Sequence, residues 1–216
     1  MRYSDGDWSE TFTDLTLPAV GIPIAFGRVY RSRSSLATAL GWGWMHSYGM
    51  SLRANADGSL TYVTEDLREL GFKKAGTSQW SAPAGWYQTV AKDASGYQMR
   101  FKDGLVYRFD LGGKLISEAD PNGNTVTLGY DSLGRLSAVT DAAGRGALTL
   151  NYDAGGKLAN VADAAGRAVF FEHVGEDLVS AQDVLGAVES YGYSSAHKLL
   201  RRTDKNGGVW TQLYCA

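Results

Sequence analysis

Residues of the types that hydrolases use occur near His46 in the sequence. Ser47 follows it directly, and Glu65, Asp66 and Glu69 come downstream. A hydrolase would use the serine as nucleophile, the imidazole as base and a carboxylate to orient it. Adjacent residues on a strand point to opposite faces, so His46 and Ser47 cannot pair without a bend. We therefore expect His46 to pack or form hydrogen bonds, and keep the hydrolase as a weak alternative.

The other two histidines and the single cysteine do not indicate a metal site or thiol chemistry. His173 occupies a column of tyrosines described below, where one ring replaces another, and His197 occupies a turn-glycine position as an expected solvent-exposed substitute. Cys215 is the only cysteine, which excludes an internal disulfide and a cysteine-based metal site, and we expect its thiol to be exposed. We expect no catalytic residue, no cofactor and no metal site.

A ladder of aspartates raises calcium binding as an alternative. They are Asp120, Asp141, Asp163, Asp183 and Asp204. A calcium loop needs several oxygen ligands that converge from a short segment. Each of these turns offers one carboxylate, and two of them follow it with Ala-Ala. Capping of the turn by the aspartate side chain explains the ladder better.

The aspartates belong to a repeated unit of the sequence, and the kind of structure that this unit forms decides where they lie. A leucine lies five residues before each aspartate, at Leu115, Leu136, Leu158, Leu178 and Leu199. A glycine lies three residues after it, at Gly123, Gly144, Gly166, Gly186 and Gly207. Successive leucines are 21, 22, 20 and 21 residues apart, a period that indicates a repeated structural unit. A second turn before each leucine leaves two segments of strand length, so each unit is predicted to be a β-hairpin.

The return strand of each hairpin alternates apolar and polar residues, which predicts a sheet buried on one face. Each alternating column ends in a ring, at Tyr130, Tyr152, His173, Tyr193 and Tyr214. Val126, Leu148, Val169, Glu189 and Trp210 stand four residues before these rings, on the same face of each return strand. In the outgoing strands Leu136 and Val139 are three residues apart, which predicts a β-bulge or burial on both faces.

The first half of the chain has its own pattern. Residues 1–53 form a leader in which prolines interrupt short alternating stretches, so edge strands or extended chain lying across other elements are expected. Trp42, Trp44, His46 and Tyr48 lie near a predicted tight bend with packed rings. Residues 54–108 are predicted to form degenerate hairpins, and residues 109–216 form the repeat array. The fold class expected is all-β: an antiparallel sheet of successive hairpins with an extended leader.

The amino-acid composition agrees with β-structure, and the net charge gives no reason to expect certain classes of binding partner. The 216 residues include 27 glycines and 12% aromatics, and the formal net charge of −2 gives no electrostatic case for nucleic acid or an anionic membrane. The N-terminus lacks the apolar core of a cleavable signal peptide. The most apolar stretch, Leu17 to Phe26, is far below the roughly 20 residues that span a membrane.

Two sets of motifs resemble one known family. Tyr130-Asp131-Ser132-Leu133-Gly134-Arg135-Leu136, repeated at 152–158, is similar to the tyrosine-aspartate (YD) repeat of Rhs proteins, teneurins and insecticidal toxin complexes. The fourth unit, with Glu176 and Asp177 at the glycine and basic positions, departs from this pattern, as does the fifth. In the leader, residues 14–18, 28–32 and 40–48 resemble segments that precede the repeats in many Rhs proteins.

The resemblance implies a function. In Rhs and toxin-complex proteins, hairpin repeats wind as a curved or spiralling sheet into a shell around a C-terminal toxin. We expect a non-catalytic segment at the start of such a bacterial shell, made in the cytoplasm and exported by a specialised route such as type VI secretion. Asp120-Pro121 matches a repeat turn better than a self-cleavage motif, so no protease activity is assigned. The chain is expected to be a piece of a longer protein.

Partners follow from the same resemblance. They would be the rest of the shell and a C-terminal toxin, and self-association is expected through an unpaired edge at Val209 to Tyr214. The alternative is a carbohydrate-binding or adhesion module that uses exposed aromatic rows of the sheet.

Overall fold

All regular structure in the part of the chain that the structure describes is β-strand, as the sequence predicts. The computed structural model describes residues 7–214, without the side chains of residues 146 and 147, and Cys215 lies outside this range. Residues 7–214 contain no helix, and hence none able to cross a membrane. The chain divides into two compact units. The leader–repeat unit joins Met1–Leu15, Ala25–His46 and Leu148–Ala216, and the roll unit joins Thr16–Ile24 and Ser47–Ala147.

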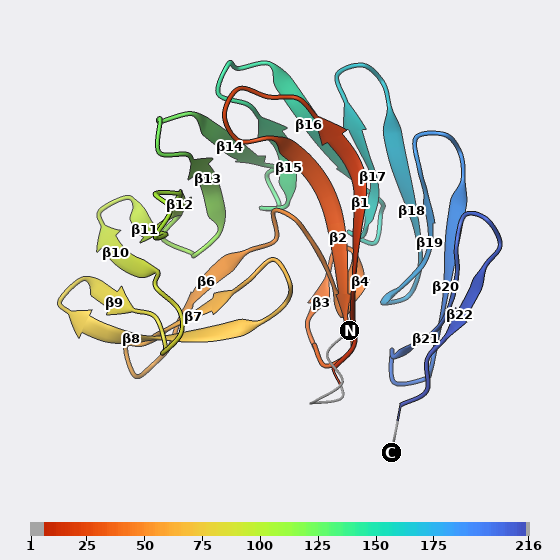
Figure 1. Ribbon diagram of the computed structural model, residues 1–216, viewed down its shortest axis with the longest axis horizontal. Helices are drawn as coiled ribbons and strands as arrows, with labels where there is room; N and C mark the ends of the chain where they lie inside the picture. Colours follow the sequence, from red (N-terminus) through yellow and green to blue (C-terminus); the bar gives the residue numbers. More distant parts are fainter. Residues whose placement is uncertain (1–6, 215–216) are drawn as a thin grey trace. The chain divides into compact units, whose positions relative to one another are not determined.

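The roll unit is a meander in which each strand pairs antiparallel with the next (Figure 1). Its strands are β6 (Ser51–Ala54), β7 (Leu60–Val63), β8 (Glu69–Gly76), β9 (Gln79–Ser81), β10 (Thr89–Asp93), β11 (Gly96–Arg100), β12 (Val106–Phe109), β13 (Leu115–Ala119), β14 (Thr125–Tyr130) and β15 (Leu136–Thr140). Residues 54–108 thus contain antiparallel strands that continue into the repeats.

Strands β6 to β13 curl into a roll, because β6 returns to the start of β13. Ser51 forms an isolated antiparallel bridge with Lys114, and the Leu52 amide donates to the Gly113 carbonyl at 2.8 Å. The interior of the roll is filled by apolar side chains that include Phe72, Met99, Phe109 and Leu115. Burial of these side chains supplies the main stabilisation of the unit.

The leader–repeat unit contains the later hairpins and the leader strands. The hairpin strands, each antiparallel to the next, are β16 (Gly146–Tyr152), β17 (Leu158–Asp163), β18 (Ala168–Val174), β19 (Asp177–Gln182), β20 (Val188–Tyr193), β21 (Leu199–Thr203) and β22 (Val209–Thr211). In the leader, β1 (Ser9–Leu17), β2 (Ile24–Arg31) and β5 (Trp44–His46) form one sheet, and β3 (Ala37–Thr38) pairs with β4 (Gly41–Trp42).

The predicted bulge is confirmed. Tyr130 pairs with Leu136 while Gly129 pairs with Ala138, so Ser137 is the extra residue of β15. The same register shift recurs between β16 and β17, β18 and β19, and β20 and β21. The bulge lets a leucine and a residue three positions later, such as Leu136 and Val139, both reach the buried face.

The repeat turns have the geometry that their residues favour. The carboxylate of Asp163 accepts the amides of Ala165 and Arg167, both at 2.9 Å, and Asp183 and Asp204 accept equivalent bonds. Amides of Asn206 and Gly208 lower the pKa of Asp204, since they favour its charged form. Hydrogen bonds of the turn thus occupy the aspartates that a calcium site would require.

One glycine combines a left-handed conformation with a close backbone approach. Gly113 and Gly123 both have φ of 85°. A Cβ at Gly113 would lie 1.7 Å from the Leu52 carbonyl oxygen, whereas a Cβ at Gly123 would meet no heavy atom within 4 Å. The two positions therefore separate backbone strain from steric exclusion.

We expect Gly123→Ala to lower the free energy of unfolding by about 1–2 kcal/mol, the cost of a left-handed alanine. Gly113→Ala should cost a further ~1–3 kcal/mol, because its methyl group would push β6 away from β13. Urea denaturation of both variants measures this difference. Equal losses in the two variants would contradict a sterically closed roll.

Candidate functional site

The most elaborate polar structure in the described chain lies where the leader packs on the repeats of its own unit. The leader meets three successive outgoing strands at or just before their first residues, at β17, β19 and β21. The contacts are Leu158 N to Ala39 O (2.8 Å), Trp42 N to Glu176 O (2.7 Å) and Leu199 N to the Tyr30 hydroxyl (3.0 Å). We call this region the leader-docking surface.

The ring column shows how the leader changes the repeat. Tyrosines of this column donate the hydroxyl hydrogen to the carbonyl of the leucine fifteen residues earlier. These bonds are Tyr130 to Leu115 (2.5 Å), Tyr193 to Leu178 (2.7 Å) and Tyr214 to Leu199 (3.0 Å). His173 instead uses Nε2 to donate to the Leu40 carbonyl of the leader at 3.2 Å. A histidine therefore stands in this column where the leader supplies the acceptor.

The fourth and fifth turns depart from the pattern at the same surface. Glu176 forms an ion pair with Lys157 at 2.5 Å, and its carbonyl binds the leader. His197 stacks on Trp42 with ring centroids 5.1 Å apart, and its Nδ1 lies 2.9 Å from an Asp177 carboxylate oxygen. His197 is half-buried, with its side chain 36% exposed, because a leader tryptophan stacks on its ring. Its φ of 59° shows that it occupies the left-handed conformation of the missing glycine.

Arg28 of β2 lies at the centre of the leader-docking surface and is 2% exposed. Its Nε and Nη2 donate to the two carboxylate oxygens of Asp14 at 2.7 and 3.1 Å, a bidentate pair. It also donates to the Tyr191 hydroxyl at 2.9 Å and reaches Glu189 at 3.3 Å. One leader side chain thus joins β1 to the repeat strand β20.

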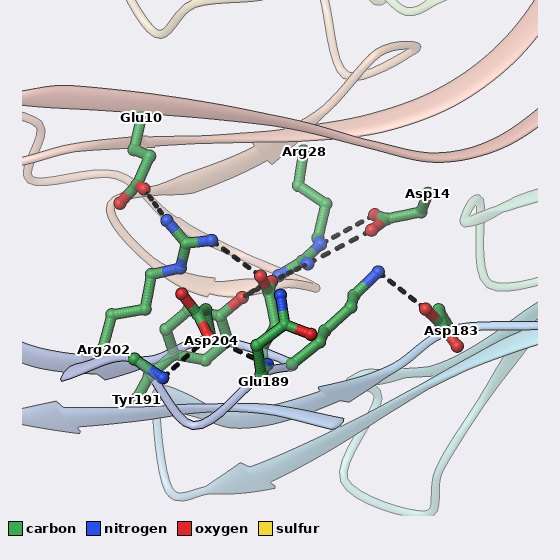
Figure 2. Close-up of polar contacts among 11 residues, drawn as sticks. Glu10, Asp14, Arg28, Asp183, Glu189, Tyr191, Arg202 and Asp204 are labelled. Carbon is green, nitrogen blue, oxygen red and sulfur yellow. Dashed lines mark hydrogen bonds and ion pairs between the residues drawn. The ribbon is translucent and has the colours of Figure 1, made fainter. Parts of the chain in front are cut away.

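Arg202 of β21 completes the network, which Figure 2 shows with Glu189 between the two arginines. It donates to Glu189 at 2.7 Å and pairs with Glu10 of β1. Both guanidinium groups lie against the Phe12 ring, at 4.6 Å for Arg28 and 4.7 Å for Arg202. These cation–π contacts partly replace the water that both cations lose.

Ion pairs and hydrogen bonds within the network keep Glu189 and Arg28 charged although burial favours their neutral forms. Burial raises the pKa of Glu189, but the bonds from Arg202 and Tyr191 outweigh it and leave the pKa below its ordinary value. For Arg28, burial opposes the charge, yet Asp14 more than offsets it and keeps the pKa raised. Burial raises the pKa of Glu10, and Arg202 offsets this only in part. The inner carboxylate and both guanidiniums are therefore charged at neutral pH.

The leader residues singled out from the sequence divide between the two units, with Trp44 beside this network. Trp44 is fully buried, stacks edge-on against Tyr191 and donates to the Tyr193 hydroxyl at 2.9 Å. Trp42 is half-buried against His197, and Tyr48 is buried in the roll unit. The tight bend between the tryptophans is present, with positive φ at Gly41 and Gly43.

His46 is buried in the leader sheet. It pairs with Arg28 across β2 and β5, and its ring stacks on Phe26 with centroids 5.7 Å apart. Burial lowers the pKa of His46 to about 4, so the ring is neutral and weakly basic near pH 7. This arrangement does not suit a general base that works near neutrality.

The repeat residues form the buried scaffold of both units. The anchor leucines Leu115, Leu136, Leu158, Leu178 and Leu199 are all buried. The turn glycines Gly123, Gly144, Gly166, Gly186 and Gly207 all have positive φ. Within residues 7–214, no group of three histidine, cysteine or acidic side chains has a metal-binding arrangement.

The sequence reasoning missed the residues that carry the docking network. They are Glu10, Asp14, Arg28, Tyr191 and Arg202, together with the partnered role of Glu189. One signal was present in the sequence, because Glu189 occupies an inward position that is apolar in the other regular strands. A buried carboxylate requires a cation or a proton, so this residue indicated a partner such as an arginine.

Comparison with known proteins gives matches in both halves of the chain. Residues 3–72 match the family described as "Domain of unknown function (DUF6531)", and residues 109–145 match "RHS Repeat". The tRNA nuclease WapA of Bacillus subtilis (strain 168) is 28% identical over 125 residues, 57% of this chain and 5% of WapA. The tRNA(Glu)-specific nuclease WapA of Bacillus subtilis subsp. natto (strain BEST195) gives the same figures.

Among solved structures, one described as "Crystal Structure of TcdB2-TccC3-Cdc42" aligns with 91% of this chain and 13% of its own. The identity is 12% and the TM-score is 0.39.

We expect Arg28→Ala to lower the free energy of unfolding by about 3–5 kcal/mol, because it leaves buried carboxylates with one cation fewer. The matched control is Arg53→Ala, whose partner Glu69 is 3.5 Å away with both side chains about half exposed, and which should cost ~0–1 kcal/mol. Denaturant titration of each variant is the measurement.

A double-mutant cycle with Glu189→Val tests the pairing directly. Valine stands at the equivalent position of other repeats. Glu189→Val should lower the free energy of unfolding of the wild-type chain, and should lower it less in the Arg28→Ala variant. Additive losses would show that Arg28 and Glu189 are not coupled.

Proposed function

Because the chain belongs to the Rhs (YD-repeat) family, we propose that it is a non-catalytic segment of a shell that encloses and helps deliver a C-terminal toxin. The observation that supports this most is the leader-docking surface. There the leader is fixed to three successive hairpins by main-chain bonds and a buried charge network. Such a strap would hold neighbouring hairpins in one curvature at the start of a wall.

The repeat architecture supports the same proposal. Hairpins of near-constant length add to a sheet one after another, so the wall can extend by repetition. Within the described residues, β22 pairs with β21 on one side, and Trp210 on β22 is 65% exposed. We propose that a further repeat strand, or another copy of the chain, pairs with this edge.

The relatives limit how far their activity can be carried over. The match to WapA covers 5% of its length, so the nuclease activity in its name is not proposed for this segment. Its bacterial source agrees with a bacterial shell protein. Export without a cleavable signal, by a specialised route such as type VI secretion, is part of the proposal.

The test begins with the coding DNA downstream of codon 216 in the native genome, followed by expression of the complete product. We expect further YD units and a C-terminal domain that resists protease in the native product. Arg28→Ala with Arg202→Ala should loosen the strap and make that domain cleavable, while Arg53→Ala should leave it protected. Cleavage of the C-terminal domain at the same rate in all three proteins would contradict enclosure.

Carbohydrate binding is a second candidate that one specific feature favours. The inward rings Phe171 and Tyr191 are buried and unavailable, but Tyr87 is 71% exposed. It lines an open cavity of about 510 Å³ with Trp86, Phe101, Lys102 and Asp103. Aromatic faces beside a few polar groups are suited to small ligands, and a sugar offers both an apolar face and hydroxyl groups.

A glycan array followed by fluorescence titration of the strongest hit tests this candidate. We expect saturable binding that Trp86→Ala abolishes and that Trp210→Ala leaves unchanged. Equal binding by both variants, or a blank array, would remove the carbohydrate proposal without affecting the shell proposal.

A further inference from the structure

Glu118 of β13 is a buried carboxyl without a cation. It is 7% exposed, and its cross-strand neighbours are Tyr107 on β12 and Val126 on β14. No hydrogen bond or ion pair reaches its carboxyl group from the described part of the chain. Glu189, the comparable buried carboxylate of the other unit, is held by Arg28 and Arg202. The two sites thus satisfy the same chemical demand in different ways.

The groups around Glu118 are acidic or phenolic. Glu65, in the turn after β7, is itself exposed, but its negative charge acts on Glu118, and Asp66 acts on Glu65 in turn. Tyr62 on β7 and Tyr107 on β12 are buried phenols whose pKa values are raised by burial and further by Glu65 and Glu118. Asp66 adds to this effect at Tyr62, and Asp103 at Tyr107. A proton is therefore the cation that this pocket can take.

Glu118 is placed where it can affect closure of the roll. Strand β13 begins at Leu115, directly after Lys114, which bridges to Ser51 of β6. That bridge and the Leu52–Gly113 bond hold the first and eighth strands of the roll together. A displacement of β13 to hydrate an ionised Glu118 would act directly on this junction.

We propose that Glu118 and Glu65 form a proton-controlled switch in the roll. The roll is held closed while Glu118 carries a proton, and it loosens at the β6–β13 junction when both carboxyls are ionised. The switch is independent of the shell function proposed above, so either proposal can fail without the other.

The direction of the pH dependence follows from the sign of the shift. Burial, and then Glu65, raise the pKa of Glu118 from 4.5 to about 7. The folded chain then binds a proton that the unfolded chain releases between these values. Stability from this group is complete below pH 4.5 and is lost as the pH rises through about 7.

The experiment is urea unfolding of the full chain from pH 5 to pH 8. The folding equilibrium constant of the roll should fall by about 10²-fold over this range, since each unit of pKa difference is a factor of ten. Amide hydrogen exchange corrected for intrinsic rates should accelerate in β6 and β13. Glu118→Gln should remove this slope, Glu65→Gln should reduce it, and the exposed control Glu69→Gln should leave it unchanged.

A titration of Glu118 in the wild-type chain tests the proposal even if a variant fails to fold. The carboxyl carbon of Glu118, followed by NMR in the wild-type chain, should titrate near pH 7, and at lower pH in Glu65→Gln. A midpoint below about pH 5, or a slope that survives in Glu118→Gln, would overturn the proposal.

Discussion

A carboxylate on the buried face of a repeat hairpin must be neutralised, and the organisation of the leader–repeat unit depends on how this is done for Glu189. Removing a carboxylate from water costs several kcal/mol unless a partner replaces the lost hydration. Arg28 and Arg202 approach Glu189 from two elements, and Asp14, Glu10 and Phe12 hold those arginines in turn. These ion pairs form only when the leader lies across β20 and β21 in one register, so they select a single packing.

The residues that depart from the repeat pattern are the ones that contact the leader in this packing. A perfect YD array would offer the leader equivalent positions along the sheet, and its register would be poorly defined. His173, Glu176 and His197 each replace a consensus residue and each contact the leader. Sequence departures that resemble decay of a repeat are thus the features that mark where the leader binds. The tyrosine-to-leucine hydrogen bond is kept at Tyr130, and at Tyr193 the hydroxyl also accepts a bond from Trp44 of the leader.

The two units solve the same electrostatic problem with different cations. Glu189 has guanidinium groups, which are charged at all accessible pH values, so its site is a fixed structural joint. Glu118 faces Glu65 and two phenols, so the pKa of its carboxyl rises until a proton serves as the cation. A fixed joint suits the strap that the shell proposal requires. A proton-dependent site suits a part of the wall that changes its stability with the surrounding pH.

The sequence by itself determined the hairpin period, the capped turns, the buried leucine columns and the bulges, because each depends on hydrogen bonds and side-chain alternation within about 20 residues. It also indicated a leader of extended strands. Only the tertiary structure decided which charges meet, since Arg28 and Tyr191 are 163 residues apart and no local rule relates them. The partners of His173 and His197 and the return of β6 to β13 were hidden for the same reason. A local offset encodes a local bond, whereas a distant contact depends on where the folded chain returns.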